Sequence, residues 1–107
     1  MLEIEKVPEL LQLVAPISAI LGPSWKFFVD EKEWEEAYHV SWRPASSTDQ
    51  YPVAVDFYTS AAEGPCVVQM FDITEERDDL SAEIKAKIHA VVAYCVANEI
   101  PYGFEQA

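Results

Sequence analysis

The residues with the clearest capacity for chemistry are acidic, and they gather in two short runs. Residues 30–36 (DEKEWEE) hold five acids, one lysine and a tryptophan, and residues 72–79 (DITEERDD) hold five acids and one arginine. Carboxylates this dense usually form a solvated face rather than the acid and base pair of a hydrolase. An aromatic anchor ringed by acids suits a basic protein partner, because the charges raise the association rate and the buried ring supplies affinity. The candidate partner-binding residues are Asp30, Glu31, Glu33, Trp34, Glu35, Glu36, Glu75, Glu76, Asp78 and Asp79.

Each acidic run also has a simpler interpretation. Trp34 can belong to the core, with the acids around it serving only to solvate that segment. Asp30 and Glu33 have the spacing of a helix cap, so residues 30–36 form either one or two helical turns or an acidic hairpin loop. The second run precedes a predicted helix, where each acid stabilises the positive end of the dipole by roughly 0.3 to 1 kcal/mol. Whether the two runs lie at the same end of a sheet depends on strand order.

The other chemically active side chains are few and scattered. His39, His89, Cys66 and Cys95 have no metal-ligand spacing, and neither acidic run has the pattern of a calcium loop. His89 and Cys95 are separated by about 240° on one helix, which prevents direct contact. Burial of Cys66 would raise its thiol pKa and oppose reactivity. We therefore expect no enzymatic activity, no metal and no cofactor, with both cysteines reduced; a disulfide between them is the alternative.

Charge is the most informative property of the composition. Nineteen Asp and Glu residues against seven Lys and Arg give the 107-residue chain a formal charge of −12. A field of that sign repels phosphate backbones and anionic lipids, and it accelerates encounter with basic proteins. We expect a basic protein partner and no direct contact with nucleic acid. Acidity that serves solubility alone is the alternative.

The first residues of the chain indicate a cytoplasmic protein. The segment MLEIEKV carries acids where a secretory signal has basic residues. The apolar run 10–21 is interrupted by Gln12, Pro16 and Ser18, and it is shorter than the roughly 20 residues of a membrane span. We therefore expect no contact with a membrane.

Two helices are predicted from hydrophobic periodicity. Pro8 suits the first turn of an N-terminal helix, Pro16 should kink that helix, and residues 22–23 (Gly-Pro) should end it; two short helices split at Ala15 are the alternative. The stronger pattern covers residues 80–99, where apolar side chains recur at three- and four-residue spacing. These side chains are Leu80, Ile84, Ile88, Val91, Val92 and Cys95.

Four stretches between the helices have the alternation of half-buried strands. Their short connections favour an antiparallel meander. The tail, residues 100–107, is expected to fold back onto the core through Tyr102 and Phe104; a loose aromatic tail that contacts a partner is the alternative. The predicted strands are residues 25–30, 38–43, 53–59 and 66–73.

These elements predict one α+β domain over residues 1–107. It comprises a kinked N-terminal helix, a four-stranded mainly antiparallel sheet and a long C-terminal helix, with both helices on one sheet face. The other face should mix charged and apolar side chains, a composition that favours dimerisation or partner docking. Its predicted residues are Lys26, Phe28, His39, Ser41, Arg43, Ala54, Asp56 and Tyr58.

Small size, acidity and missing catalytic machinery favour a non-enzymatic function. We expect a protein that neutralises a basic nuclease or nucleic-acid-binding protein, as an immunity protein or a phage-encoded inhibitor would, with carboxylates as nucleic-acid mimics. The second hypothesis is a structural or chaperone-like homodimer that uses the mixed sheet face, and the third is a small hydrolase. Salt separates the first two, because screening weakens association between opposite charges and changes apolar dimerisation little.

Overall fold

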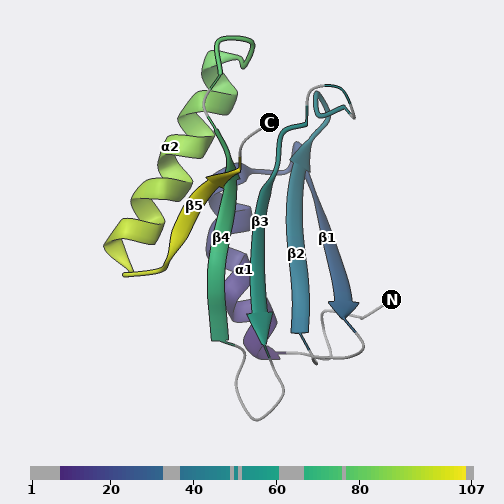
Figure 1. The fold of residues 1–107 in the computed structure, drawn as a ribbon, viewed down its shortest axis with the longest axis vertical. Coiled ribbons are helices and arrows are strands. Elements are labelled where there is room, and N and C mark those ends of the chain that lie inside the picture. Colours follow the sequence, from purple (N-terminus) through teal and green to yellow (C-terminus); the bar gives the residue numbers. More distant parts are fainter. Residues whose placement is uncertain are drawn as a thin grey trace.

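The computed structural model describes residues 8–32, 37–48, 50, 52–60, 67–75 and 77–105. The fold is α+β, as the sequence predicts, with two helices and a five-stranded, mostly antiparallel sheet (Figure 1). The elements in chain order are α1 (Pro8–Leu21), β1 (Trp25–Lys32), β2 (Ala37–Pro44), β3 (Val55–Ser60), β4 (Val67–Thr74), α2 (Ala82–Ala97) and β5 (Tyr102–Glu105).

The strands lie in the sheet in the order in which they occur in the chain. Strands β1 to β4 form an antiparallel meander, and β5 pairs with β4 in parallel after the chain has crossed over through α2 (Figure 1). The prediction of four strands is therefore wrong by one. The additional strand is the tail, whose backbone satisfies the open edge of β4; Phe71 donates its N–H to the carbonyl of Pro101 at 2.9 Å.

Helix α1 is a single helix that begins at Pro8 and continues through Pro16. The alternative of two helices split at Ala15 is therefore wrong. The helix ends where Gly22 adopts a φ of 85° and donates its N–H to the carbonyl of Ser18 at 2.9 Å. A left-handed residue at this position favours glycine, because a side chain would be strained there.

Helix α2 is shorter by two residues at each end than the predicted range 80–99. Its cap is Ser81, whose hydroxyl accepts the N–H of Ile84 at 3.2 Å and so satisfies one of the free donors of the first turn. The buried face consists of Ile88, Val91 and Cys95, which all belong to the predicted apolar stripe.

The core lies between one face of the sheet and both helices. Four aromatic rings cross its centre from β1 to β4, with neighbouring centroids 5.2, 5.5 and 5.0 Å apart. These rings belong to Phe27, Trp42, Phe57 and Phe71. Buried residues of α1 and α2 pack in the same cluster, and the Trp42 indole Nε1 donates to the Ser18 hydroxyl at 3.0 Å. Burial of so much aromatic surface is the main force that holds the helices against the sheet.

The structure also excludes the helical turns that are one alternative for the start of the first acidic run. Strand β1 continues through Asp30 and Glu31 to Lys32, so a helix capped by Asp30 does not form. None of the helices in the described part of the chain is long and apolar enough to cross a membrane.

Candidate functional site

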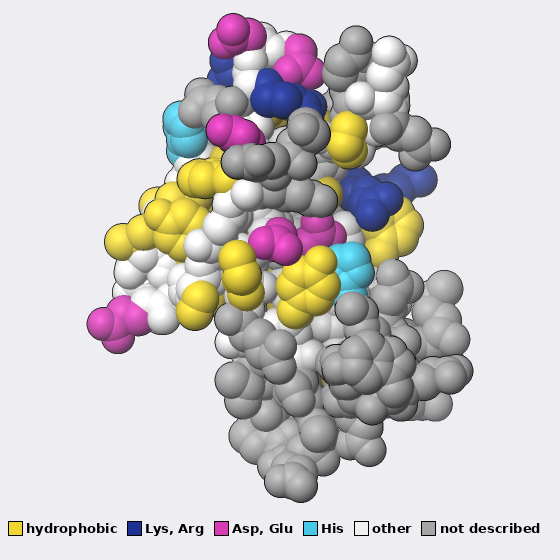
Figure 2. Space-filling view, viewed as in Figure 1, with side chains coloured by type: hydrophobic (Ala, Val, Ile, Leu, Met, Phe, Trp, Pro, Cys, Tyr) yellow, Lys and Arg dark blue, Asp and Glu magenta, His cyan; other side chains and the backbone are white. Residues whose placement is uncertain are grey.

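The sheet face opposite the helices is open, and it carries the mixed set of side chains that strand alternation predicts. Strand register places these side chains in rows across the sheet. In one row Phe28 is opposite Ser41, which is opposite Asp56 and then Asp72; Lys26 is opposite Arg43 in the next row. The space-filling view of this face shows basic side chains over β1 and β2 and acidic ones nearer its centre (Figure 2).

A hollow of about 600 Å³ opens on this face. Strands β1 to β3 form its floor, and the segment between β2 and β3 forms one wall. The residues that line the hollow are Lys26, Phe28, His39, Arg43, Pro44, Ala45, Ser47, Thr48, Pro52, Val53, Ala54, Asp56 and Tyr58. Its volume lies within the range of about 300 to 1,000 Å³ that small-molecule pockets occupy.

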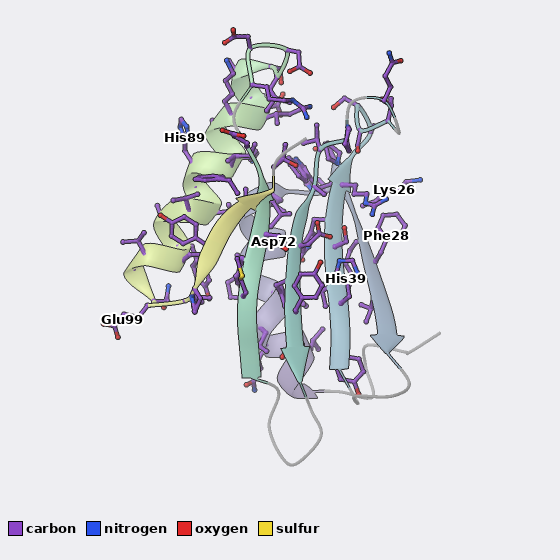
Figure 3. All side chains as sticks on the ribbon, viewed as in Figure 1. Lys26, Phe28, His39, Asp72, His89 and Glu99 are labelled. Atoms are coloured by element: carbon purple, nitrogen blue, oxygen red, sulfur yellow. The ribbon has the colours of Figure 1, made fainter. Side chains whose placement is uncertain are left out.

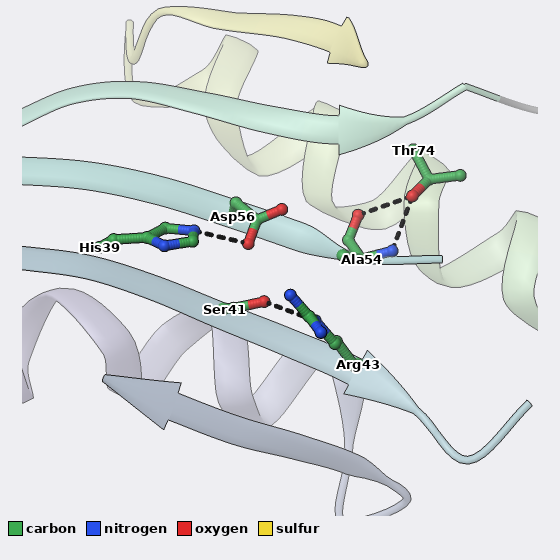
Figure 4. A network of polar contacts seen from close by, with 6 residues as sticks. All are labelled: His39, Ser41, Arg43, Ala54, Asp56 and Thr74. Atoms are coloured by element: carbon green, nitrogen blue, oxygen red, sulfur yellow. Dashed lines mark hydrogen bonds and ion pairs between the residues drawn. The ribbon is translucent and has the colours of Figure 1, made fainter. Parts of the chain in front are cut away.

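A histidine and a buried carboxylate form a pair at the floor of the hollow. His39 Nε2 lies 2.9 Å from Asp56 Oδ1, and Asp56 is only 6% exposed (Figure 4). The His39 ring stacks on Tyr58, with centroids 4.8 Å apart and planes 11° from parallel. A carboxylate that orients an imidazole is a general-base arrangement, and it equally stabilises a buried charge. Among the described residues, no three His, Cys, Asp or Glu side chains are grouped so that they could hold a metal ion.

The basic side of the hollow is formed by Lys26 and Arg43. Arg43 donates from Nε to the Ser41 hydroxyl at 3.3 Å (Figure 4). Its guanidinium carbon lies 5.9 Å from the centroid of the Phe28 ring. These two contacts hold the guanidinium group along β2. In Figure 3, Lys26, Phe28 and His39 all project from the same open face of the sheet.

The wall of the hollow is fixed to β4 by hydrogen bonds. The Thr74 hydroxyl accepts the N–H of Ala54 at 2.6 Å and donates to the Ala54 carbonyl at 3.0 Å (Figure 4). Ser47 accepts the N–H of Val53 at 3.0 Å, and Arg77 Nη1 donates to the Pro52 carbonyl at 3.1 Å. The wall therefore has a defined position relative to the floor.

A second depression, of about 470 Å³, lies between α2 and β5. We call it the α2–β5 groove, and its lining residues are Glu75, Ile88, His89, Val92, Ala93 and Phe104. Phe104 is 50% exposed, so much of its apolar ring is accessible at this groove. Sequence reasoning placed Phe104 on the core and did not find this groove, because the groove forms only when the tail pairs with β4.

The structure separates the two acidic runs. The first run begins near the end of β1, and the second begins near the end of β4 and continues beyond it. Because β1 and β4 are antiparallel within the meander, their C-terminal ends lie at opposite ends of the sheet (Figure 1). Each strand has eight residues, so these ends are roughly 25 Å apart at about 3.3 Å per residue. The described residues of the first run therefore do not form one continuous surface with Glu75, Asp78 and Asp79.

The predicted site residues thus divide into three groups. Asp30 and Glu31 belong to β1, where their backbones pair with His39 and Tyr38. Glu75, Asp78 and Asp79 are exposed near the start of α2, and Asp79 accepts a hydrogen bond from Arg77 Nε at 3.0 Å. The remaining candidates, Glu33, Trp34, Glu35, Glu36 and Glu76, lie outside the described residues.

Cys95 is a free thiol in the core, with no exposed surface. Desolvation by burial raises its pKa to about 11. A thiol with that pKa is protonated at neutral pH and is a poor nucleophile. Cys66, and any pairing that involves it, lies outside the described residues.

No protein-family model matches this chain, and comparisons with curated proteins and with solved structures give no match. The fold and its surfaces define a small α+β protein with an open, mixed sheet face and an acid-edged apolar groove.

Proposed function

We propose that this chain is a non-enzymatic binding protein that neutralises a basic protein, and that the α2–β5 groove is its main contact surface. The observation that carries the proposal is the position of Glu75, which lines an otherwise largely apolar groove. Further exposed acids, Asp78, Asp79 and Glu83, follow in the segment that leads into α2 and in its first turn. Acidic side chains and an apolar groove therefore lie close together, and a basic partner with an apolar anchor could contact both.

Charge and apolar contact have different parts in this proposal. Of the four acids, only Asp79 pairs with a basic side chain within the part of the chain that the structure describes. The others are available to attract a partner, and the charge of −12 extends that attraction over the whole molecule. Phe104 and Val92 then supply apolar surface, which usually determines how slowly such complexes dissociate.

The class of partner follows from this chemistry. Proteins with dense basic surfaces are typically nucleases or other nucleic-acid-binding proteins, and carboxylates can occupy the places of phosphates. We propose the role of an immunity protein or a phage-encoded inhibitor that acts in the cytoplasm. The described part of the first acidic run, residues 30–32, lies at the other end of the sheet and would serve as a separate contact.

The test is capture of proteins from a lysate of the source cells and their neighbours at about 0.05 M and 0.5 M salt, which brackets the range over which surface charges become screened. The immobilised baits are the wild-type protein, Glu75→Lys, and the matched control Glu99→Lys. Both substitutions change the charge equally at exposed positions, but Glu99 follows the far end of α2 (Figure 3). Bound proteins are identified by mass spectrometry.

We expect one basic protein that the wild type and Glu99→Lys retain at low salt, that Glu75→Lys loses, and that high salt releases. Equal retention by both variants would remove the groove from the proposal. A protein that captures only itself, with a defined oligomer on sizing that salt does not change, would support the homodimeric alternative. That alternative is favoured by the exposed Phe28 and Met70 on the open face.

A further inference from the structure

The hollow on the open sheet face contains two basic side chains that have no acidic partner among the residues described in the structure. Nineteen acids and only seven Lys and Arg residues are present in the chain. Nevertheless Lys26 and Arg43 lie directly opposite each other on neighbouring strands, and neither forms an ion pair with any residue that the structure describes. Like charges in this arrangement destabilise a sheet. An anion bound between the two side chains would remove that repulsion.

We propose that this hollow binds a small planar anion, an aromatic or heterocyclic carboxylate or phosphate. The site is separate from the α2–β5 groove and does not depend on the function proposed for that groove. The anionic group would lie between Lys26 and Arg43, and the ring of the ligand would lie against the apolar lining.

Arg43 is oriented for this role. The Nε hydrogen bond to Ser41 and the contact with the Phe28 ring hold its planar group, while Nη1 and Nη2 make no hydrogen bond to the described residues. A guanidinium group binds carboxylate and phosphate oxygens through paired, parallel N–H donors. Because the group is already positioned, little side-chain freedom is lost when an anion binds.

The remainder of the hollow suits a flat ring. Phe28 is 46% exposed and lies beside Arg43. Tyr58 also lines the hollow, and its ring is stacked on His39. Pro44 and Pro52 line the hollow and add rigid apolar surface. Aromatic rings favour offset stacking or edge contacts with another ring, so these side chains select a planar ligand over an aliphatic one.

The acidic residues nearby do not oppose this assignment. Among the side chains that the structure describes, Asp56 is the only acid that lines the hollow, and His39 contacts its carboxylate at 2.9 Å. Asp72 is opposite Asp56 on β4 and does not line the hollow. The net charge of the chain acts from farther away, and at 0.15 M salt it is screened over about 8 Å.

The experiment is a titration of the ¹⁵N-labelled full chain, followed by NMR at about 0.15 M salt. The probes are benzoate and phenyl phosphate, with benzamide as the neutral analogue and inorganic phosphate as the anion without a ring, each up to about 10 mM. We expect saturable shifts for benzoate or phenyl phosphate, centred on the amides of residues 26–28, 41–43 and 54–58. Whichever of benzoate and phenyl phosphate binds more tightly identifies carboxylate or phosphate as the preferred anionic group. Benzamide and inorganic phosphate should bind at least about tenfold more weakly than that probe.

Substitutions then assign the site. Lys26→Gln and Arg43→Gln should each weaken binding of the preferred probe at least about tenfold, whereas Lys85→Gln on α2, an equal change in charge, should not. The spectrum of each variant verifies its fold. Binding that is unchanged in both Lys26→Gln and Arg43→Gln, shifts centred outside the hollow, or no saturable shift with either ring-bearing anion would overturn the proposal. Equal affinity for inorganic phosphate would overturn the assignment of a planar ligand.

Discussion

Lys26 and Arg43 are direct cross-strand partners on β1 and β2, two like charges on the open face of a sheet whose chain is strongly acidic. Strand register brings their positions together, and Arg43 is held there by Ser41 and Phe28. Such a pair costs stability, and the anion proposed to bind in the hollow beside it would remove that cost.

Removing one of these charges should stabilise the free protein. We expect Lys26→Gln to raise the free energy of unfolding by about 0.2 to 1 kcal/mol, because the cross-strand repulsion is lost. Urea denaturation at low salt measures the change, and the gain should shrink as salt is added. The control Lys85→Gln has no basic cross-strand partner and should show no comparable gain. A loss of stability in Lys26→Gln would contradict the assignment of repulsion.

The hydrogen bonds between Thr74 and Ala54 should be important for stability. Thr74→Val keeps the shape of the side chain but leaves the buried N–H of Ala54 without its acceptor, so we expect a loss of about 1 to 3 kcal/mol. Thr74→Ser retains the hydroxyl and should recover most of that loss. Thermal or urea unfolding of the three proteins makes the comparison. A valine variant as stable as the wild type would contradict the importance of these hydrogen bonds.

The hydrogen bond from Trp42 to Ser18 should couple α1 to the sheet. Ser18→Ala leaves the indole N–H without this acceptor, and we expect a loss of about 1 to 3 kcal/mol. In the Trp42→Phe background the same substitution should cost much less, because no donor is left unpaired. A double-mutant cycle in urea measures the coupling, with Ser46→Ala in an exposed turn as the control. Equal costs in both backgrounds would mean that the bond adds nothing.

Cys95 should make stability depend on pH in alkaline solution. Burial raises the pKa of its thiol from 9.0 to about 11, so the unfolded chain loses this proton before the folded protein does. The protonated thiol contributes fully to the free energy of unfolding below about pH 9. Between about pH 9 and pH 11 this contribution falls by up to about 1.4 kcal/mol per pH unit. Urea unfolding of the wild type and Cys95→Ala across this range isolates the effect from other titrating groups. The stability difference between the two proteins should shrink as pH rises; a constant difference would show that the thiol does not titrate in this way.

The helices and the first four strands could be predicted from local patterns. Ile88, Val91 and Cys95 repeat at helical spacing, and their burial confirms the apolar face of α2. Strand alternation correctly assigned the open face because successive side chains of a strand point to opposite sides. The fifth strand could not be predicted in this way. It has only four residues, including Gly103, and it forms because β4 offers unpaired backbone groups along its length.

By itself, then, the sequence determined which side chains share a face, because that depends only on the geometry of each helix or strand. Only the tertiary structure decided which of those side chains are neighbours. His39 and Asp56 are 17 residues apart and meet through the register of β2 with β3, a long-range choice that no local spacing encodes. The register of β1 with β2 places Lys26 opposite Arg43, and the antiparallel order of the strands places the described parts of the two acidic runs toward opposite ends of the sheet. These relationships arise because all strands bury one common core. Each strand must take the register that places its apolar side chains in that core and pairs its backbone with the neighbouring strands.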